Sequence, residues 1–201
     1  MIKNSILIYY SNDDKLGDYF YQCGTKSEYL LNQYSKISQT AITEEKCNSV
    51  FINDVELPRH NKPSLLLIFS HGSTSAFSKH EGLAFFGDFT EKPQCLDGGL
   101  VYSNACSVGS SFGVKIAEDN SSFFGYNDIT SIDLNYPNIF IECDIHALHH
   151  ILKGKTLSEA REKAQKKFNA RMEDVSYFAA SYLRQARDRV VIHGNINTPF
   201  F

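Results

Sequence analysis

Two short apolar runs determine how this chain is expected to fold: Ser64-Leu-Leu-Leu-Ile-Phe-Ser-His71-Gly72 and Gly99-Leu-Val-Tyr-Ser-Asn-Ala-Cys106. Both runs lack Lys, Arg, Asp and Glu and are bounded by proline or glycine, which is typical of strands buried on both faces. In an open α/β sheet, reactive groups lie at the carboxyl ends of the strands. We therefore expect His71 and Cys106 to lie side by side on one edge of a sheet.

Apolar periodicities before the first run alternate between those of strands and those of helices. The predicted elements are, in order, a strand at 5–10, an amphipathic helix from Leu16 that Gly24 breaks or kinks, a strand at 36–43, and a helix capped by Thr43 and stopped by Pro58.

The same alternation continues after Cys106, so the whole pattern indicates a doubly wound α/β fold. The predicted elements are a helix beginning at Ser110 or Ser111, a strand at 122–126, a helix at 140–152, a helix opened by the capping box Thr156-Leu-Ser-Glu159, a helix around 175–183, and a final strand at 189–194.

Length and composition set further bounds on the protein. A chain of 201 residues is the size of one domain with a full core, so we expect a single domain over 1–201. The net charge of −3, with both signs interspersed, argues against a nucleic-acid partner. No apolar run has the length of a membrane span or of a signal-peptide core. The five cysteines, odd in number and irregularly spaced, indicate reduced thiols and a cytoplasmic location.

The residues that close the two apolar runs suggest nucleophilic chemistry. A thiol needs a base to become a thiolate, and a neighbouring imidazole is the usual one. Cys106 is therefore the candidate nucleophile, and His71 is its candidate general base. Because Gly72 has no side chain, its N–H can approach a substrate closely and form an oxyanion hole with the N–H of Cys106. Taken alone, Cys106 would be a small buried core residue; His71-Gly72 at the end of the preceding run favours the catalytic interpretation.

The pair of motifs, a hydrophobic run closed by His-Gly and a second closed by Ala-Cys, resembles the clan CD cysteine peptidases. That clan holds caspases, legumain, clostripain, gingipain and separase, and the bacterial CHAT domains look closest to this chain. Between the motifs, Gly82-Leu-Ala-Phe-Phe-Gly-Asp-Phe resembles the small hairpin that CHAT domains place there. The likeness extends from Ser5 to about Asn195.

This resemblance implies a fold and a function. The fold would be a caspase-like three-layer sandwich, with a mostly parallel central sheet and helices on both faces. The activity would be that of a cysteine endopeptidase that uses a His-Cys dyad, without a cofactor, to cleave a partner protein. Bacterial CHAT proteins of this sort commonly act in antiviral defence or programmed cell death, which is the role that the resemblance implies here.

The resemblance says less about which substrate is cleaved. Relatives that cleave after Lys or Arg tend to carry an acidic residue two positions before the nucleophile, where this chain has Asn104. Caspases bind aspartate through arginines, one of them in the loop after the first strand. That loop, 11–15, has no Arg and contains Asp13 and Asp14, so a strict aspartate preference is not expected. Asn104 and Asp128 are the candidate substrate-binding residues, which leaves a basic or an uncharged residue open.

Two alternative functions remain. Gly109-Ser-Ser111-Phe-Gly113 matches the G-x-S-x-G pattern of serine hydrolases, but that pattern requires its first glycine directly after a strand, whereas the strand here should end near Ser103. The other alternative is a catalytically idle caspase-like interaction module. The presence of both His71 and Cys106 counts against it.

A histidine-rich stretch within 140–152 raises the question of a metal site. His146 and His150 are spaced i, i+4, and His149, Asp144, Cys143 and Glu142 lie nearby. The apolar stripe of that helix passes through 141, 145, 148 and 152, so the three histidines should lie on a solvated face. We therefore expect no metal.

Activation by an internal cut is not expected. Caspases are often activated by cleavage between the segment of the nucleophile and the next strand, but here 107–121 is needed for a helix. Control should instead come from an activating partner protein, from trimming at an end, or from substrate supply. The loop 73–80, next to His71, is the element that such an event would order.

Overall fold

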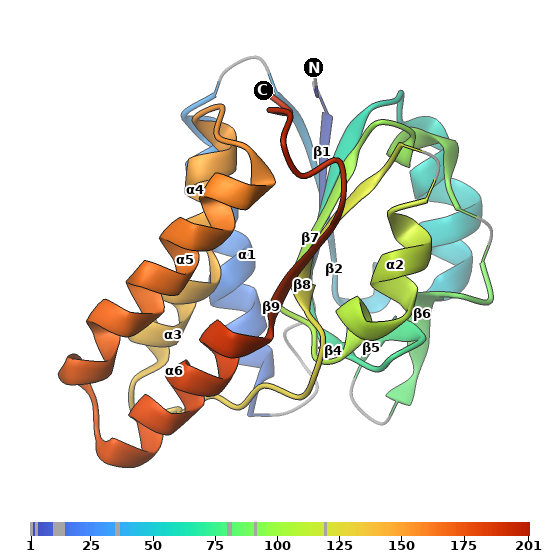
Figure 1. Ribbon diagram of the computed structural model, residues 1–201. Coiled ribbons are helices and arrows are strands. Elements are labelled where there is room, and N and C mark those ends of the chain that lie inside the picture. Colours follow the sequence, from blue (N-terminus) through green and yellow to red (C-terminus); the bar gives the residue numbers. More distant parts are fainter. Residues whose placement is uncertain are drawn as a thin grey trace.

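A six-stranded sheet forms the centre of the molecule (Figure 1). The computed structural model describes residues 2, 4–9, 15–34, 37–79, 82–90, 92–118 and 120–201. The strand order is β2-β1-β3-β7-β8-β9, and all neighbours are parallel except β9, which runs antiparallel to β8. The strands are β1 (Asn4–Tyr9), β2 (Ser38–Thr43), β3 (Ser64–Phe69), β7 (Leu100–Ser103), β8 (Ser122–Tyr126) and β9 (Val190–Gly194).

Helices cover both faces of this sheet, which confirms the three-layer α/β sandwich (Figure 1). One face carries α1 (Gly17–Asn32), α3 (Pro137–Asp144), α4 (His146–Leu152), α5 (Leu157–Arg171) and α6 (Tyr177–Arg189). The other face carries the π-helix η2 (Phe51–Glu56), the short helix α2 (Phe112–Ile116), and a small antiparallel sheet of β4 (His71–Gly72), β5 (Ala76–Ser78) and β6 (Ala84–Gly87).

The sheet is hydrophobic on both faces because both are covered. In β3, Leu65, Leu67 and Phe69 pack in the core under α1 and α3–α6, whereas Leu66 and Ile68 pack in the core under η2 and α2. All five are fully buried. Side chains alternate between the faces of a strand, so a continuous apolar run is what a sheet covered on both faces requires.

The structure corrects the prediction that Gly24 breaks or kinks the first helix. α1 runs unbroken through Gly24. A Cβ at this position would lie 2.4 Å from the ring of Tyr9. The glycine therefore permits close packing between α1 and the last residue of β1 rather than ending the helix.

The predicted helix from Thr43 to Pro58 is also corrected. The segment consists of a 3-10 turn at Glu44–Lys46, the π-helix η2, and a second 3-10 turn at Leu57–Arg59. The Thr43 side chain makes no capping hydrogen bond. The apolar residues of this segment do not form one buried helical stripe. Ile52 and Leu57 are buried, whereas Val50 and Val55 are exposed.

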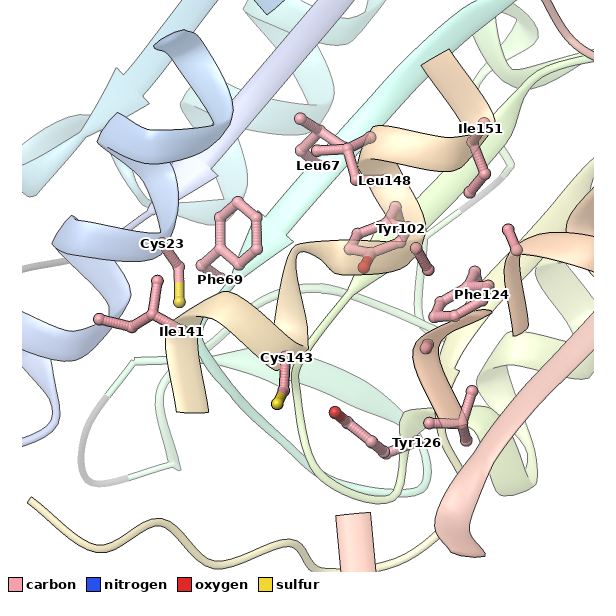
Figure 2. Close-up of a cluster of buried hydrophobic side chains, with 14 of the residues drawn as sticks. Cys23, Leu67, Phe69, Tyr102, Phe124, Tyr126, Ile141, Cys143, Leu148 and Ile151 are labelled. Carbon is pink, nitrogen blue, oxygen red and sulfur yellow. The ribbon is translucent and has the colours of Figure 1, made fainter. Parts of the chain in front are cut away.

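The predicted helix over 140–152 is interrupted at Ile145, between α3 and α4. The Tyr102 hydroxyl donates a hydrogen bond to the Asp144 carbonyl and is also bonded to the backbone of Leu148. A side chain inserted into the i to i+4 hydrogen bonds of a helix is a recognised cause of a kink. In Figure 2 the Tyr102 ring extends from the sheet to the place where α3 and α4 meet.

Most of the remaining predicted elements are confirmed, but the last helix, predicted around 175–183, extends to Arg189, and the segment 82–89 supplies only one strand of the predicted hairpin. The capping box at the start of α5 is present, with the Thr156 side chain accepting from the Glu159 N–H and the Glu159 side chain accepting from the Thr156 N–H. The predicted hairpin at 82–89 contains β6, which pairs with β5. Among the described residues, no helix is long and apolar enough to cross a membrane.

Candidate active site

His71 follows directly on the buried strand β3 but belongs to a different sheet. β3 ends at Phe69, and His71 begins β4, which pairs with β5 on one side of the central sheet. The Ser70 hydroxyl donates to the His71 carbonyl over 2.8 Å. The Phe20 ring, from α1, lies edge-on to the imidazole at 5.2 Å between centroids. These contacts hold the half-buried imidazole at the carboxyl end of β3.

Cys106 lies three residues beyond the carboxyl end of β7, in a tight turn. The Ser103 hydroxyl accepts from the Ala105 N–H and donates to the Ile68 carbonyl, which ties this turn to β3. Ser107 then adopts the left-handed conformation, with φ of 62°, and the Val108 N–H donates to the Cys106 carbonyl over 2.8 Å. A non-glycine residue in this conformation is strained, and such strain is concentrated at functional sites.

Gly72 lies against the Cys106 turn. A Cβ on Gly72 would be 2.6 Å from the Cys106 carbonyl oxygen and 2.8 Å from the Ala105 Cβ, so no larger residue fits. The Ser73 N–H bonds the Ala76 carbonyl. Since hydrogen-bonded pairs alternate along an antiparallel ladder, the next pair, Gly72 with Phe77, is not hydrogen-bonded, and the Gly72 N–H points away from β5.

His71 and Cys106 line the same pocket, which has a volume of about 280 Å³. Its other lining residues include Leu16, Phe20, Ile132 and Asp144. The expected juxtaposition of the ends of the two apolar runs is thus present. Cys106 is also the accessible thiol, because the other four cysteines, Cys23, Cys47, Cys95 and Cys143, are all buried.

The segment after β8 packs against Cys106. The Thr130 N–H donates to the Cys106 Sγ over 3.3 Å, and the carbonyl and hydroxyl oxygens of Thr130 both lie 3.5 Å from the same sulfur. Thr130 is not among the residues predicted from the sequence. No motif signals it, because a backbone N–H donor can belong to any residue except proline.

Asn104 lines this pocket, and its exposed fraction is 6%. Its side-chain amide donates to the Asp144 carboxylate over 3.2 Å. The hydroxyls of Tyr19 and Tyr126 donate to the same carboxylate over 2.8 and 2.6 Å. Burial raises the pKa of Asp144, and the three hydrogen bonds oppose that effect. Asp144 was considered at the sequence level only as a neighbour of the histidines; in the structure it is the last residue of α3 and lines the pocket.

The remaining sequence candidates lie elsewhere. Asp128 is not among the residues lining the pocket, and its carboxylate pairs with Arg189 at 3.0 Å, although its carbonyl accepts from the Ser107 N–H. Ser111 is exposed, precedes α2, and does not line the pocket. The residues used to argue against an aspartate preference, 11–14, lie outside the described part of the chain. So does His80, and residues 76–78 of the predicted loop 73–80 form the strand β5.

The histidine-rich stretch is less exposed than predicted. His146, His149 and His150 are all half-buried, and the Nε2 atoms of His146 and His150 lie 3.3 Å apart. Burial, with the nearby His150, lowers the pKa of His146 from 6.5 to about 4. Within the described residues there is no group of three metal-binding side chains.

A larger cavity, of about 610 Å³, lies away from His71 and Cys106, beside η2 and the segment 89–95. Its cysteine, Cys95, is buried, which raises the pKa of the thiol to about 11. Its histidine, His60, is paired with Glu56 at 2.8 Å. This cavity therefore offers a less suitable nucleophile and base than the pocket of Cys106.

Comparison with solved structures identifies the fold. Gingipain R, described as an Arg-specific cysteine proteinase, superimposes with a TM-score of 0.68 over 98% of this chain, at 15% identity. The structure of pro-sf-caspase-1 gives 0.58 over 96% at 12% identity, and caspase-1 from Spodoptera frugiperda gives 0.57 over 96% at 11% identity. No protein-family model matches the chain, and no curated protein is similar to it in sequence.

The chain therefore has the caspase-like fold of the clan CD cysteine proteases. It spans about half the length of the gingipain R structure, 47%, and 92% of the pro-sf-caspase-1 structure. At these identities the likeness concerns the fold.

Proposed function

We propose that this protein is a cysteine endopeptidase with Cys106 as nucleophile and His71 as general base. One observation carries the proposal: the accessible thiol of the chain lines the same pocket as the imidazole that closes the neighbouring strand. The protease fold supports the proposal, because in parallel α/β sheets this edge is where active sites form.

The proposed reaction has two steps. In the first, His71 accepts the thiol proton, Cys106 Sγ attacks the peptide carbonyl carbon, and the imidazolium protonates the departing amine. In the second, His71 removes a proton from water, which attacks the thioester and releases the acid product. The product is a free carboxylate and a restored thiol, so no cofactor is consumed.

The oxyanion formed in each step needs hydrogen-bond donors. The Gly72 N–H points away from β5, and the Cys106 N–H has no backbone acceptor within the described part of the chain. Both donors belong to backbone held in place by the contact of Gly72 with the Cys106 carbonyl. We assign these two N–H groups to the oxyanion hole, where one donor contributes about 3 kcal/mol in a serine protease.

The substrate is proposed to be a partner protein, with Asn104 in the wall of the pocket that receives it. A role in bacterial antiviral defence or programmed cell death, in the cytoplasm and under an activating partner, is proposed on the CHAT-like motifs alone. The alternative, an idle interaction module, is disfavoured because the pocket of Cys106 is open and no larger side chain fills the position of Gly72.

Labelling with a peptidyl chloromethyl ketone tests the proposal. We expect one adduct, mapped by mass spectrometry to Cys106, that is absent in Cys106→Ala and formed much more slowly in His71→Ala. Cys95→Ala is the matched control, since Cys95 is buried, and it should label like the parent protein. An unlabelled parent protein that is folded would favour the interaction module instead.

A further inference from the structure

The pocket of Cys106 contains a carboxylate without a cationic partner. Asp144 accepts hydrogen bonds from Tyr19, Tyr126 and Asn104, all of which are uncharged donors. No Lys, Arg or His side chain in the described part of the chain forms an ion pair with it. An unpaired charge is costly to bury, and a bound cation would offset that cost.

Asn104 supplies a second unused acceptor beside this carboxylate. Its side-chain oxygen is buried and has no hydrogen-bond partner among the described residues. Exchanging the oxygen and nitrogen of the Asn104 amide would not give the oxygen a donor. The oxygen would then face the carboxylate of Asp144, to which the NH₂ group now donates. Asp144 and Asn104 both line the pocket, so this wall carries a carboxyl group beside an amide oxygen that has no hydrogen-bond partner among the described residues.

The remaining walls suit the stem of a long side chain. Leu16, Phe20 and Ile132 are apolar, and the volume of about 280 Å³ is slightly below the range of drug-sized ligand pockets. Asn104, Cys106 and Asp144 line this same pocket, so a side chain that enters it beside Cys106 can reach the carboxylate. Lysine and arginine combine an apolar stem with a terminal cation rich in donors.

We propose that Asp144, together with the Asn104 side-chain oxygen, binds the Lys or Arg side chain of the residue whose carbonyl carbon Cys106 attacks. This inference rests on the proposed peptidase activity and specifies its substrate class. The selecting carboxylate comes from the end of α3, forty positions after Asn104, rather than from the strand of the nucleophile. Burial raises the pKa of Asp144, and a bound cation would relieve that unfavourable burial.

The test compares two peptides that differ only in arginine or citrulline before the cleaved bond. Citrulline keeps the shape of arginine but is uncharged. We expect the full chain to cleave the arginine peptide with a kcat/KM about 100-fold higher. In Asp144→Asn this ratio should fall to below about fivefold, because the carboxylate is lost but the size and hydrogen-bonding capacity are nearly kept. Glu142→Gln is the matched control, since Glu142 lies on the same helix and pairs with Lys167 and Arg171.

Each outcome has a separate meaning. If the parent protein cleaves both peptides equally, or prefers citrulline, the inference is wrong although the peptidase proposal stands. If the preference for arginine is kept in Asp144→Asn but lost in Asp128→Asn, then Asp128, and not Asp144, binds the cationic side chain of the substrate. If no peptide is cleaved and Cys106 is not labelled, the proposed function itself fails. The ratio for the parent protein needs no variant, so it is decisive even if Asp144→Asn does not fold.

Discussion

The backbone N–H of Thr130 donates to the Sγ of Cys106 over 3.3 Å. This contact joins the segment after β8 to the turn after β7, and it is reinforced by the bond between the Ser107 N–H and the Asp128 carbonyl. Cys106 is thus contacted from two neighbouring strands of the sheet. Its environment depends on how closely the segment after β8 packs against the turn after β7.

Gly72→Ala tests that close packing. The new Cβ would meet the Cys106 carbonyl oxygen at 2.6 Å and the Ala105 Cβ at 2.8 Å, both of which belong to a constrained turn. The turn must shift, and displacement of a reacting group by about 1 Å can reduce the rate about 100-fold. We expect kcat/KM, measured well below the melting temperature, to fall by about that factor, and the melting temperature to fall as well. Unchanged activity in the Gly72→Ala variant would contradict the placement of Gly72 in the site.

Tyr102→Phe tests the cause of the break between α3 and α4. The change removes the hydroxyl that bonds the Asp144 carbonyl and keeps the ring, which stacks on Phe124. Leaving buried backbone groups without a partner costs about 1–3 kcal/mol. We expect urea unfolding to show a loss of that size, whereas Tyr182→Phe, at a half-buried tyrosine, should show none. Equal stability of the two variants would mean that the hydroxyl does not shape the helix.

His146 predicts how stability depends on pH. Its pKa is lowered in the folded protein from 6.5 to about 4, so the folded state favours the neutral imidazole. The resulting stability is present above pH 6.5 and is lost as the pH falls towards 4. We expect the drop in melting temperature between about pH 7 and about pH 5 to be smaller in His146→Gln.

The same measurement tests the expectation that no metal is bound. A chelator should leave the melting temperature of the parent protein unchanged at both pH values. Stoichiometric zinc in the purified protein, lost in His146→Gln, would contradict this expectation.

The sequence was informative wherever one chemical requirement determined a residue. The buried strand β3 had to be apolar along its whole length, and the turn after it had to contain residues that the core did not need. The predicted common edge of His71 and Cys106 followed from the parallel arrangement of β3 and β7, and the two residues do line one pocket.

Other features depended on packing that no local pattern records. Asp144 lines the pocket from the last position of α3, where the Tyr102 hydroxyl of β7 bonds its carbonyl and the helix is interrupted. Thr130 acts through its backbone N–H, which carries no residue signature. Gly24 was interpreted from its helix propensity, whereas its position is determined by contact with Tyr9.

We predict that the active protein keeps His71 and Cys106 on one uncut chain. The segment between β7 and β8 contains α2 and buries Val108, Phe112 and Ile116, so cleavage there would expose core residues. Mass spectrometry of the most active preparation should find no cut between Cys106 and Phe123. Activity that appears only after a cut in this interval would contradict the prediction.

The central claim is that Cys106 and His71 act together as a catalytic dyad, and cleavage of a quenched peptide library by single variants tests it most directly. Removing either member of a dyad removes most of the nucleophilic pathway, so Cys106→Ala and His71→Ala should each lower kcat/KM by at least about 10³-fold with the fold intact. Ser111→Ala should keep most of the activity. An active Cys106→Ala protein together with an inactive Ser111→Ala protein would contradict the account.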